Sequence, residues 1–274
     1  MKNIAIGQYY PTDSALHRLD PRMKIVLAVL YIVCSFLCKN IYSFALLALS
    51  AVVLILIGKI PLKTVWLGLR AVLFILILTS VINIFLTKGT SVPLLEWKFI
   101  RIYREGLYAA LFMVIRIMVL IIGTGMFLTY TTTPIELTDA LEDLLSPLKK
   151  IRVPVHEFAM MMTIALRFIP TLVEETDKIM TAQKARGADF THGSLVQRVK
   201  ALIPIIIPLF VSAFNRAGDL AVAMECRCYH GGEGRTRMHV RYIRFVDFIP
   251  LFVIVLFGAL LVMLNLLGFG YTMA

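Results

Sequence analysis

Five long apolar runs divide the chain, and segments rich in polar and charged residues separate them. A helix needs about 20 residues to cross the hydrocarbon core of a bilayer, and irregular backbone is too costly in lipid to be common there. The first two runs are separated only by Lys39 and Asn40, which predicts a tight hairpin of two helices. The first run is short, so its helix reaches spanning length only together with the turns on either side of it. The predicted spans cover residues 25–38, 41–57, 69–86, 107–130 and 248–269.

The segment between the fourth and fifth runs is the only long part that is not membrane-like, and it predicts three amphipathic helices. The first covers Pro134–Leu145. Thr133 is expected to cap it, and Glu136 completes a capping box. Three acidic residues predict a solvated helical face rather than a metal site: Asp139, Glu142 and Asp143.

The second amphipathic helix is predicted over Val155–Arg186, where apolar residues recur at near-helical spacing. Pro170 lacks an amide hydrogen and should bend the helix. Gly187 stands where a helix end favours a positive φ, which holds Arg186 in the last turn. Taken alone, a cation at that place is explained by its attraction to the helix dipole.

The third helical pattern covers Ser194–Tyr229 and carries Arg227 at its end. Pro204 and Pro208 interrupt its apolar middle, so we interpret it as too short and bent for a simple span and expect it at the membrane surface or against the spans. Arg216 and Asp219 are predicted to pair along the helix. A stripe of small residues would allow another helix to approach closely: Ala213, Ala217, Gly218 and Ala221.

Composition supports a membrane protein, because 59% of the 274 residues are hydrophobic and only 16% are charged. A typical soluble domain has about 25% charged residues. The expected fold class is therefore an all-α integral membrane protein with about five transmembrane helices. Its expected domains are an N-terminal membrane domain (1–133), a cytoplasmic coupling domain (134–247) and a C-terminal transmembrane helix (248–274).

The basic residues predict the orientation of the chain in the cell membrane. Of the 28 lysines and arginines, 22 fall on one side of the predicted spans and five on the other, and Arg116 lies within a span. The positive-inside rule then places the N-terminus and the coupling domain in the cytoplasm and the C-terminus outside. Because these charges follow the membrane borders, the net charge of +11 does not favour nucleic-acid binding.

Two further groups of charges have a simple structural interpretation. Residues 17–24 before the first span are interpreted as a solvated arm at the membrane surface. Arg116 is expected either to snorkel toward water or to face protein rather than lipid.

Motifs for nucleotide binding, metalloprotease chemistry and serine hydrolysis are missing from the sequence. Cys226, Cys228 and His230 fall one ligand short of a tetrahedral zinc site, and no second cysteine pair supports them. Carboxylates avoid the predicted spans, which disfavours an ion-coupled carrier. Neither a metal nor a cofactor is expected on this chain.

The arginine motifs and their surroundings carry a resemblance to a known family. Ala185-Arg186-Gly187 and, about forty residues later, Cys226-Arg227-Cys228 resemble the paired Ala-Arg-Gly motifs of the transmembrane T component of energy-coupling factor transporters. The segments around them match as well: residues 17–22, 166–172 and 223–225. The resemblance covers most of the chain.

The resemblance implies a subunit of an ABC-type importer of vitamins or other micronutrients. Two cytoplasmic ATPase subunits, which bind the ATP and Mg²⁺, would each hold one arginine motif in a groove, and a separate membrane protein, the S component, would bind the substrate. Arg186 and Arg227 would be the two anchors, with Ala185, Gly187, Cys226 and Cys228 as their neighbours. Cysteine is small enough for close approach, but Cys228 lacks the backbone freedom of glycine.

Two other functions stay open from the residues. One is a membrane-bound enzyme acting on lipid, which would use Glu174, Glu175 and Asp177, or the Cys226, Cys228 and His230 group. The other is a stand-alone solute permease. The substrate and the number of S components that share the chain are not encoded in any motif of this sequence.

Overall fold

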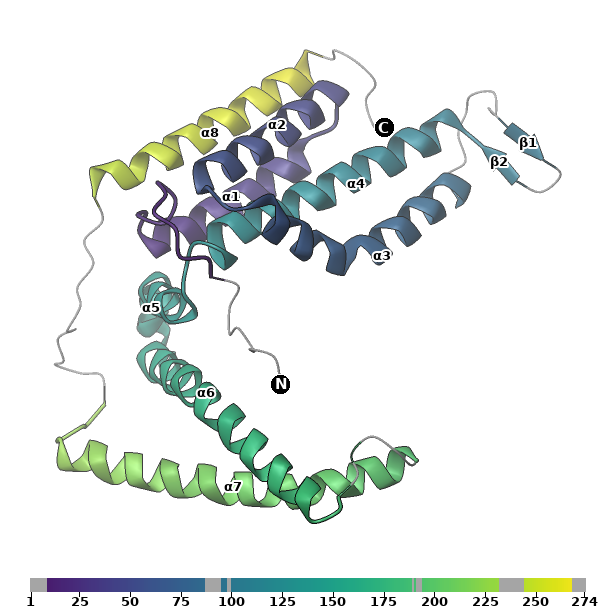
Figure 1. Cartoon of the computed structure of the whole chain (residues 1–274). Helices are drawn as coiled ribbons and strands as arrows, with labels where there is room; N and C mark the ends of the chain where they lie inside the picture. Colours follow the sequence, from purple (N-terminus) through teal and green to yellow (C-terminus); the bar gives the residue numbers. More distant parts are fainter. Residues whose placement is uncertain are drawn as a thin grey trace. The chain divides into compact units, whose positions relative to one another are not determined.

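The structure is a computed structural model that describes residues 9–86, 95–97, 100–188, 190, 194–231 and 244–267 (Figure 1). The predicted all-α class is confirmed, with one short antiparallel hairpin of β1 (Leu95–Trp97) and β2 (Ile100–Ile102) as a local addition. The helices are α1 (Pro21–Leu37), α2 (Ile41–Gly58), α3 (Leu62–Leu86), α4 (Arg104–Thr124), the π-helix η1 (Gly125–Thr129), α5 (Pro134–Leu145), the 3₁₀-helix η2 (Ser146–Ile151), α6 (Val155–Ala185), α7 (Leu195–Cys226) and α8 (Phe245–Leu266).

The chain folds into two compact units. The bundle unit, residues 6–140 and 241–274, contains α1–α4, η1 and α8. The two-helix unit, residues 141–240, contains α6 and α7. The helix α5 begins in the bundle unit and ends in the two-helix unit.

Helix α1 is the centre of the bundle unit, where it packs against α4 and α8, while α3 runs along α4 (Figure 1). The core between the helices contains a stacked aromatic pair, because the rings of Phe44 on α2 and Phe112 on α4 have centroids 4.6 Å apart. Gly123 lets α1 and α4 approach closely, because a methyl group at this position would overlap the ring of Tyr31. This packing buries one face of the first apolar run despite the short length of its helix.

Five helical segments among the described residues are long and apolar enough to cross a membrane: Ile41–Gly58, Leu62–Phe85, Arg104–Thr129, Val196–Cys226 and Phe245–Leu266. Helix α1 is not among them, because it has only 17 residues. Helix α7 is among them by length and composition, so our expectation that it is too short for a span is wrong. Its expected place at the membrane surface or against the spans stays a prediction. Pro204 and Pro208 leave α7 continuous over 32 residues. The expected end of the last span falls partly beyond Leu267, outside the described residues.

The segment before α1, residues 9–20, is a packed arm and not the solvated arm that we expected. Leu16 and Leu19 are buried, and Asp20 caps α1 by accepting a hydrogen bond from the Arg22 amide (2.9 Å). The ammonium group of Lys24 is also buried and donates to the carbonyl oxygen of Thr131 (2.7 Å). The arm therefore contributes Leu16 and Leu19 to the interior of the bundle unit.

Arg116 faces protein, which was one of our two expectations for this residue. Its guanidinium group donates to the carbonyl oxygen of Cys38 (3.0 Å), which follows the last residue of α1. The same group lies over the rings of Phe36 and Phe44, at 5.8 and 5.2 Å from their centroids. A cation at this place satisfies a carbonyl group that the end of a helix leaves without a helical partner.

Candidate functional site

Helix α6 ends at the first arginine motif with a complete Schellman arrangement. The amide of Gly187 donates to the Lys184 carbonyl oxygen, and the amide of Ala188 donates to the Gln183 carbonyl oxygen, both at 3.0 Å. Gly187 has φ +88°, which confirms the predicted positive φ. These bonds place Arg186 at the C-cap, the first residue beyond the helix.

Helix α7 ends at the second arginine motif in the same way. The amide of Cys228 donates to the Glu225 carbonyl oxygen (2.9 Å), and the amide of Tyr229 donates to the Met224 carbonyl oxygen (3.0 Å). Cys228 has φ +54° and takes the place that Gly187 has in the first motif. Arg227 is again the C-cap residue. Two different sequences thus present an arginine from the same backbone geometry.

All six residues of the two motifs are exposed. A methyl group at Gly187 would meet no atom of the described chain within 4 Å, so packing inside this chain does not require a small residue there. The positive φ favours glycine at position 187. No backbone angle of this kind explains why the neighbouring Ala185 is small. We refer to residues 185–187 as the α6 end and to residues 226–228 as the α7 end.

An ion pair within the two-helix unit connects α6 to α7. The guanidinium group of Arg216 donates to Glu175 Oε2 at 2.7 Å, and both side chains are partly exposed. The predicted pairing of Arg216 with Asp219 is therefore wrong, because the partner of Arg216 lies on the other helix. Figure 1 shows the C-terminal end of α6 near α7, whereas the C-terminal end of α7 lies well apart from α6.

Capping boxes begin two of the helices, and only the one of α5 was predicted. Ser194 caps α7 with its hydroxyl group, and Gln197 completes the capping box. Thr133 and Glu136 form the predicted capping box of α5, with bonds of 3.2 and 3.3 Å. Each of these bonds joins residues only three apart, so the sequence alone specifies them.

The residues proposed for helix packing are not brought together within the described chain. Pro170 on α6 is exposed, and α6 stays helical through it. On α7, Ala213 is half-buried, while Ala217, Gly218 and Ala221 are exposed. A methyl group at Gly218 would meet no atom of the described chain within 4 Å. Their role in packing against another helix remains a prediction.

The residues proposed for an enzyme make an ion pair or a backbone contact, or are exposed. Glu175 is held by Arg216, and Glu174 is exposed. The ring of His230 contacts the carbonyl oxygen of Cys228 (2.9 Å) rather than a thiol group. Within the part of the chain that the structure describes, no group of three or more histidine, cysteine or acidic residues is placed to hold a metal ion.

Two polar contacts were missed by the sequence reasoning. Glu142 is not on a solvated face, because its side chain is largely buried and contacts His156 at 3.0 Å. Asp247, in the first turn of α8, is also buried and accepts hydrogen bonds from the amides of Arg244 (2.8 Å) and Asp20 (3.4 Å). The only sequence signal for Asp247 was its place at the border of a span.

Comparison with known proteins covers most of the chain. The profile of the CbiQ family, described as "Cobalt transport protein", matches residues 12–240. A protein of Clostridium kluyveri is 52% identical over 249 residues, which are 91% of this chain and 92% of that protein. A protein of Ruminiclostridium cellulolyticum is 53% identical over 246 residues (89% and 91%), and one of Bacillus subtilis is 48% identical over 237 residues (86% and 89%). Each of the three is named "Energy-coupling factor transporter transmembrane protein EcfT".

Proposed function

Since the chain belongs to the CbiQ family and, within it, to the energy-coupling factor transporter transmembrane proteins, we propose that it transmits the work of two cytoplasmic ATPase subunits to a separate substrate-binding membrane subunit. Membership of this family makes the chain a non-catalytic, multi-pass membrane component of a transporter. The lipid-modifying enzyme is therefore not supported. The transported compound would be a vitamin or another micronutrient, selected by the separate subunit.

The observation that carries this proposal is the shared geometry of the α6 end and the α7 end. Each presents an exposed arginine at the C-cap of a long helix, fixed by two backbone hydrogen bonds. A guanidinium group offers five donors in a planar fork, which suits carboxylate and carbonyl groups in a protein groove. Two similar ATPase subunits would present two such grooves, and one asymmetric chain needs two arginines to occupy both.

Small neighbours on both sides of each arginine support a protein partner. A cation that served the helix dipole alone would not need Ala185 or Cys226 beside it. Small side chains let the backbone approach the wall of a groove, so that the arginine reaches its floor. When ATP binding moves the grooves, the long helices α6 and α7 would carry that movement as rigid rods.

Replacement of the arginines tests the proposal. We expect Arg186→Ala and Arg227→Ala each to weaken ATPase binding by about 2 kcal/mol or more, which is about thirtyfold, because an anchoring arginine at a protein interface has effects of this size. Co-purification of the ATPase subunits from detergent extracts measures the effect. Arg198→Ala is the matched control, since Arg198 is exposed near the start of α7.

Full ATPase co-purification and full uptake in the Arg186→Ala, Arg227→Ala double variant would contradict the proposed function. Substrate binding by the purified chain without its partners would favour the stand-alone permease instead. The different sequences of the α6 end and the α7 end would suit two non-identical ATPase subunits, one for each end. Equal affinity of both ATPase subunits for each isolated motif would count against this division.

A further inference from the structure

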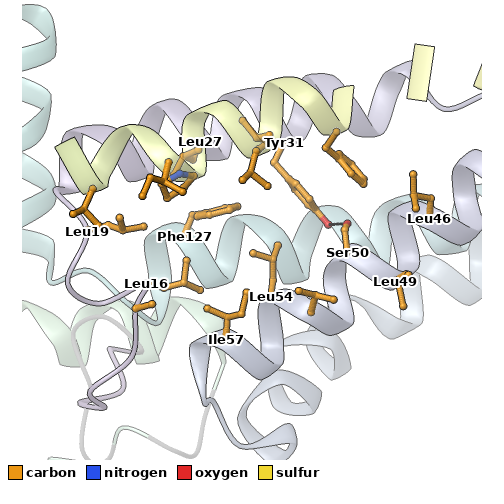
Figure 2. Close-up of a pocket in the computed structure, with 18 residues that line it drawn as sticks. Leu16, Leu19, Leu27, Tyr31, Leu46, Leu49, Ser50, Leu54, Ile57 and Phe127 are labelled. Atoms are coloured by element: carbon orange, nitrogen blue, oxygen red, sulfur yellow. Dashed lines mark hydrogen bonds between the residues drawn. The ribbon is translucent and has the colours of Figure 1, made fainter. Parts of the chain in front are cut away.

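The bundle unit contains an apolar cavity of about 580 Å³ between α1, α2, α8 and the arm (Figure 2). Its floor is formed by the buried side chains of Leu27, Tyr31 and Phe127. The Tyr31 hydroxyl group lies 3.0 Å from the Ser50 hydroxyl oxygen, so these two polar groups satisfy each other. The volume is in the usual range of about 300–1,000 Å³ for a ligand site, and the lining suits hydrocarbon.

The cavity opens as a groove between α2 and α8. Leu49, Val53 and Ile57 recur every four residues along α2, and each lines the groove although it is at least 43% exposed. Val246 and Val253 on α8 line the groove from the other side and are also exposed. Both helices have the length and composition of membrane spans, so we place this opening within the depth of the bilayer.

The length of the groove along α2 is close to the thickness of one membrane leaflet. Figure 2 shows Leu16 and Leu19 toward one end of it and Leu46 toward the other. From Leu46 to Ile57, α2 rises by about 16 Å at 1.5 Å per residue. Half of a hydrocarbon core of about 30 Å is about 15 Å. The match suits an acyl chain that enters from one face of the membrane.

Basic residues lie close in sequence to the lining residues at the end of the groove near Leu16. The end of α2 reaches this place, because a methyl group at Gly58 would lie 3.6 Å from Leu16 Cδ1. The start of α8 reaches it as well, through the hydrogen bond between the Asp20 amide and Asp247. The arm, the end of α2 and the start of α8 each carry one exposed cation within two residues of a lining residue: Arg18, Lys59 and Arg244.

We propose that the groove binds one acyl chain of an anionic phospholipid from the cytoplasmic leaflet, and that the headgroup phosphate contacts Arg18, Lys59 and Arg244. The inference rests on the proposed topology, which places this end at the cytoplasmic surface. A transmembrane helix of another protein would match the apolar lining, but it would give no reason for three cations at one end. An anionic headgroup on an acyl chain matches both features.

A steric variant with a matched neighbour tests the acyl site. Val53 lines the groove, whereas Val52 is 52% exposed on the same helix and does not line it. The purified transporter complex is mixed with equal amounts of phosphatidylglycerol and phosphatidylcholine, and native mass spectrometry measures the bound lipid. Val53→Trp should reduce bound phospholipid about tenfold, while Val52→Trp should leave it unchanged. Val253→Trp is a second filling variant, in case Val53→Trp does not fold.

A charge variant tests the headgroup contact. Wild-type complex should retain phosphatidylglycerol in preference to phosphatidylcholine. The triple variant Arg18→Gln, Lys59→Gln, Arg244→Gln should bind both lipids equally. The control is Lys39→Gln, because Lys39 is exposed at the other end of the α1–α2 hairpin.

Equal lipid occupancy in the Val53→Trp and Val52→Trp variants would overturn the inference, as would a wild type without preference for the anionic lipid. A cross-link from residue 53 to another protein subunit in place of lipid would overturn it too. ATPase co-purification is recorded on the same samples. Loss of lipid with intact ATPase binding separates this inference from the proposed function, and labelling of the cytoplasmic side tests the topology independently.

Discussion

At the scale of single residues, the two helix ends differ most in the residue that follows the arginine. Gly187 has φ +88° and Cys228 has φ +54°. The left-handed region open to residues with a side chain lies at about +50° to +70°, so cysteine is tolerated at the α7 end, whereas the α6 end requires glycine. The departure of the second motif from glycine is thus compatible with the same hydrogen bonds.

Exchanging the two residues should reveal this difference. We expect Gly187→Cys to destabilise the last turn of α6 by about 1 kcal/mol or more, because the new side chain is strained at this φ. Cys228→Gly should change the α7 end by less, since the existing φ is already allowed. Hydrogen–deuterium exchange of peptides over residues 180–188 and 222–230 measures both effects. Equal acceleration of exchange in the two variants would contradict the explanation.

Single residues were predictable from the sequence where their partners are close in the chain. The capping pair Thr133 and Glu136, and the positive φ of Gly187, follow from residue type and spacing alone. The ion pair of Arg216 with Glu175 joins residues 41 positions apart. Its partner depends on how α6 packs against α7, which the spacing of charges along one helix does not specify.

At the scale of secondary-structure elements, the packed arm is tied to the segment that leads into α5. The Tyr10 amide donates to the Tyr130 carbonyl oxygen at 3.0 Å, and Lys24 binds the next carbonyl oxygen, that of Thr131. Lys24 also donates to the His17 carbonyl oxygen at 3.3 Å, so one ammonium group joins α1, the arm and the end of the fourth span. Buried charges of this kind persist only with such partners.

Removal of this ammonium group should loosen the arm. Lys24→Met keeps the length of the side chain, but it leaves the carbonyl groups of His17 and Thr131 without that donor. We expect a loss of about 2 kcal/mol and a fall of about 4–8 °C in the unfolding midpoint of the detergent-purified protein. Lys63→Met, at an exposed position of α3, is the control. An unchanged midpoint would show that the arm is held by its apolar contacts alone.

Elements were predictable where hydrophobic periodicity and end signals agree. The bounds of α5, α6 and α7 lie within a few residues of those expected. The arm was misjudged because its charged residues resemble a solvated segment, while Leu16 and Leu19 are buried only through tertiary packing. The continuity of α7 was misjudged because each proline removes one amide donor, and neighbouring hydrogen bonds keep the helix intact.

At the scale of the whole molecule, the distribution of lysines and arginines along the chain is what predicts the orientation of both units. The rule counts basic residues in the segments that connect the spans, and it is independent of the packing of α1–α4. The two-helix unit folds as a compact body of its own. The sequence indicates this division because continuous apolar runs give way to amphipathic helical patterns. It contains no signal for the orientation of one unit relative to the other.

The native cysteines provide a test of the orientation. Cys226 and Cys228 at the α7 end are exposed, whereas Cys34 and Cys38 are buried in the bundle unit. A maleimide that cannot cross the membrane should therefore label the chain in inside-out vesicles and leave it unlabelled in intact cells, because the proposed topology places the α7 end in the cytoplasm. The Cys226→Ser, Cys228→Ser variant should lose the label, which assigns it to these two residues. Bound ATPase subunits should slow the labelling, since the proposed groove covers both thiols. Labelling in intact cells that disappears in the same variant would place the α7 end outside, where no ATPase can reach Arg227.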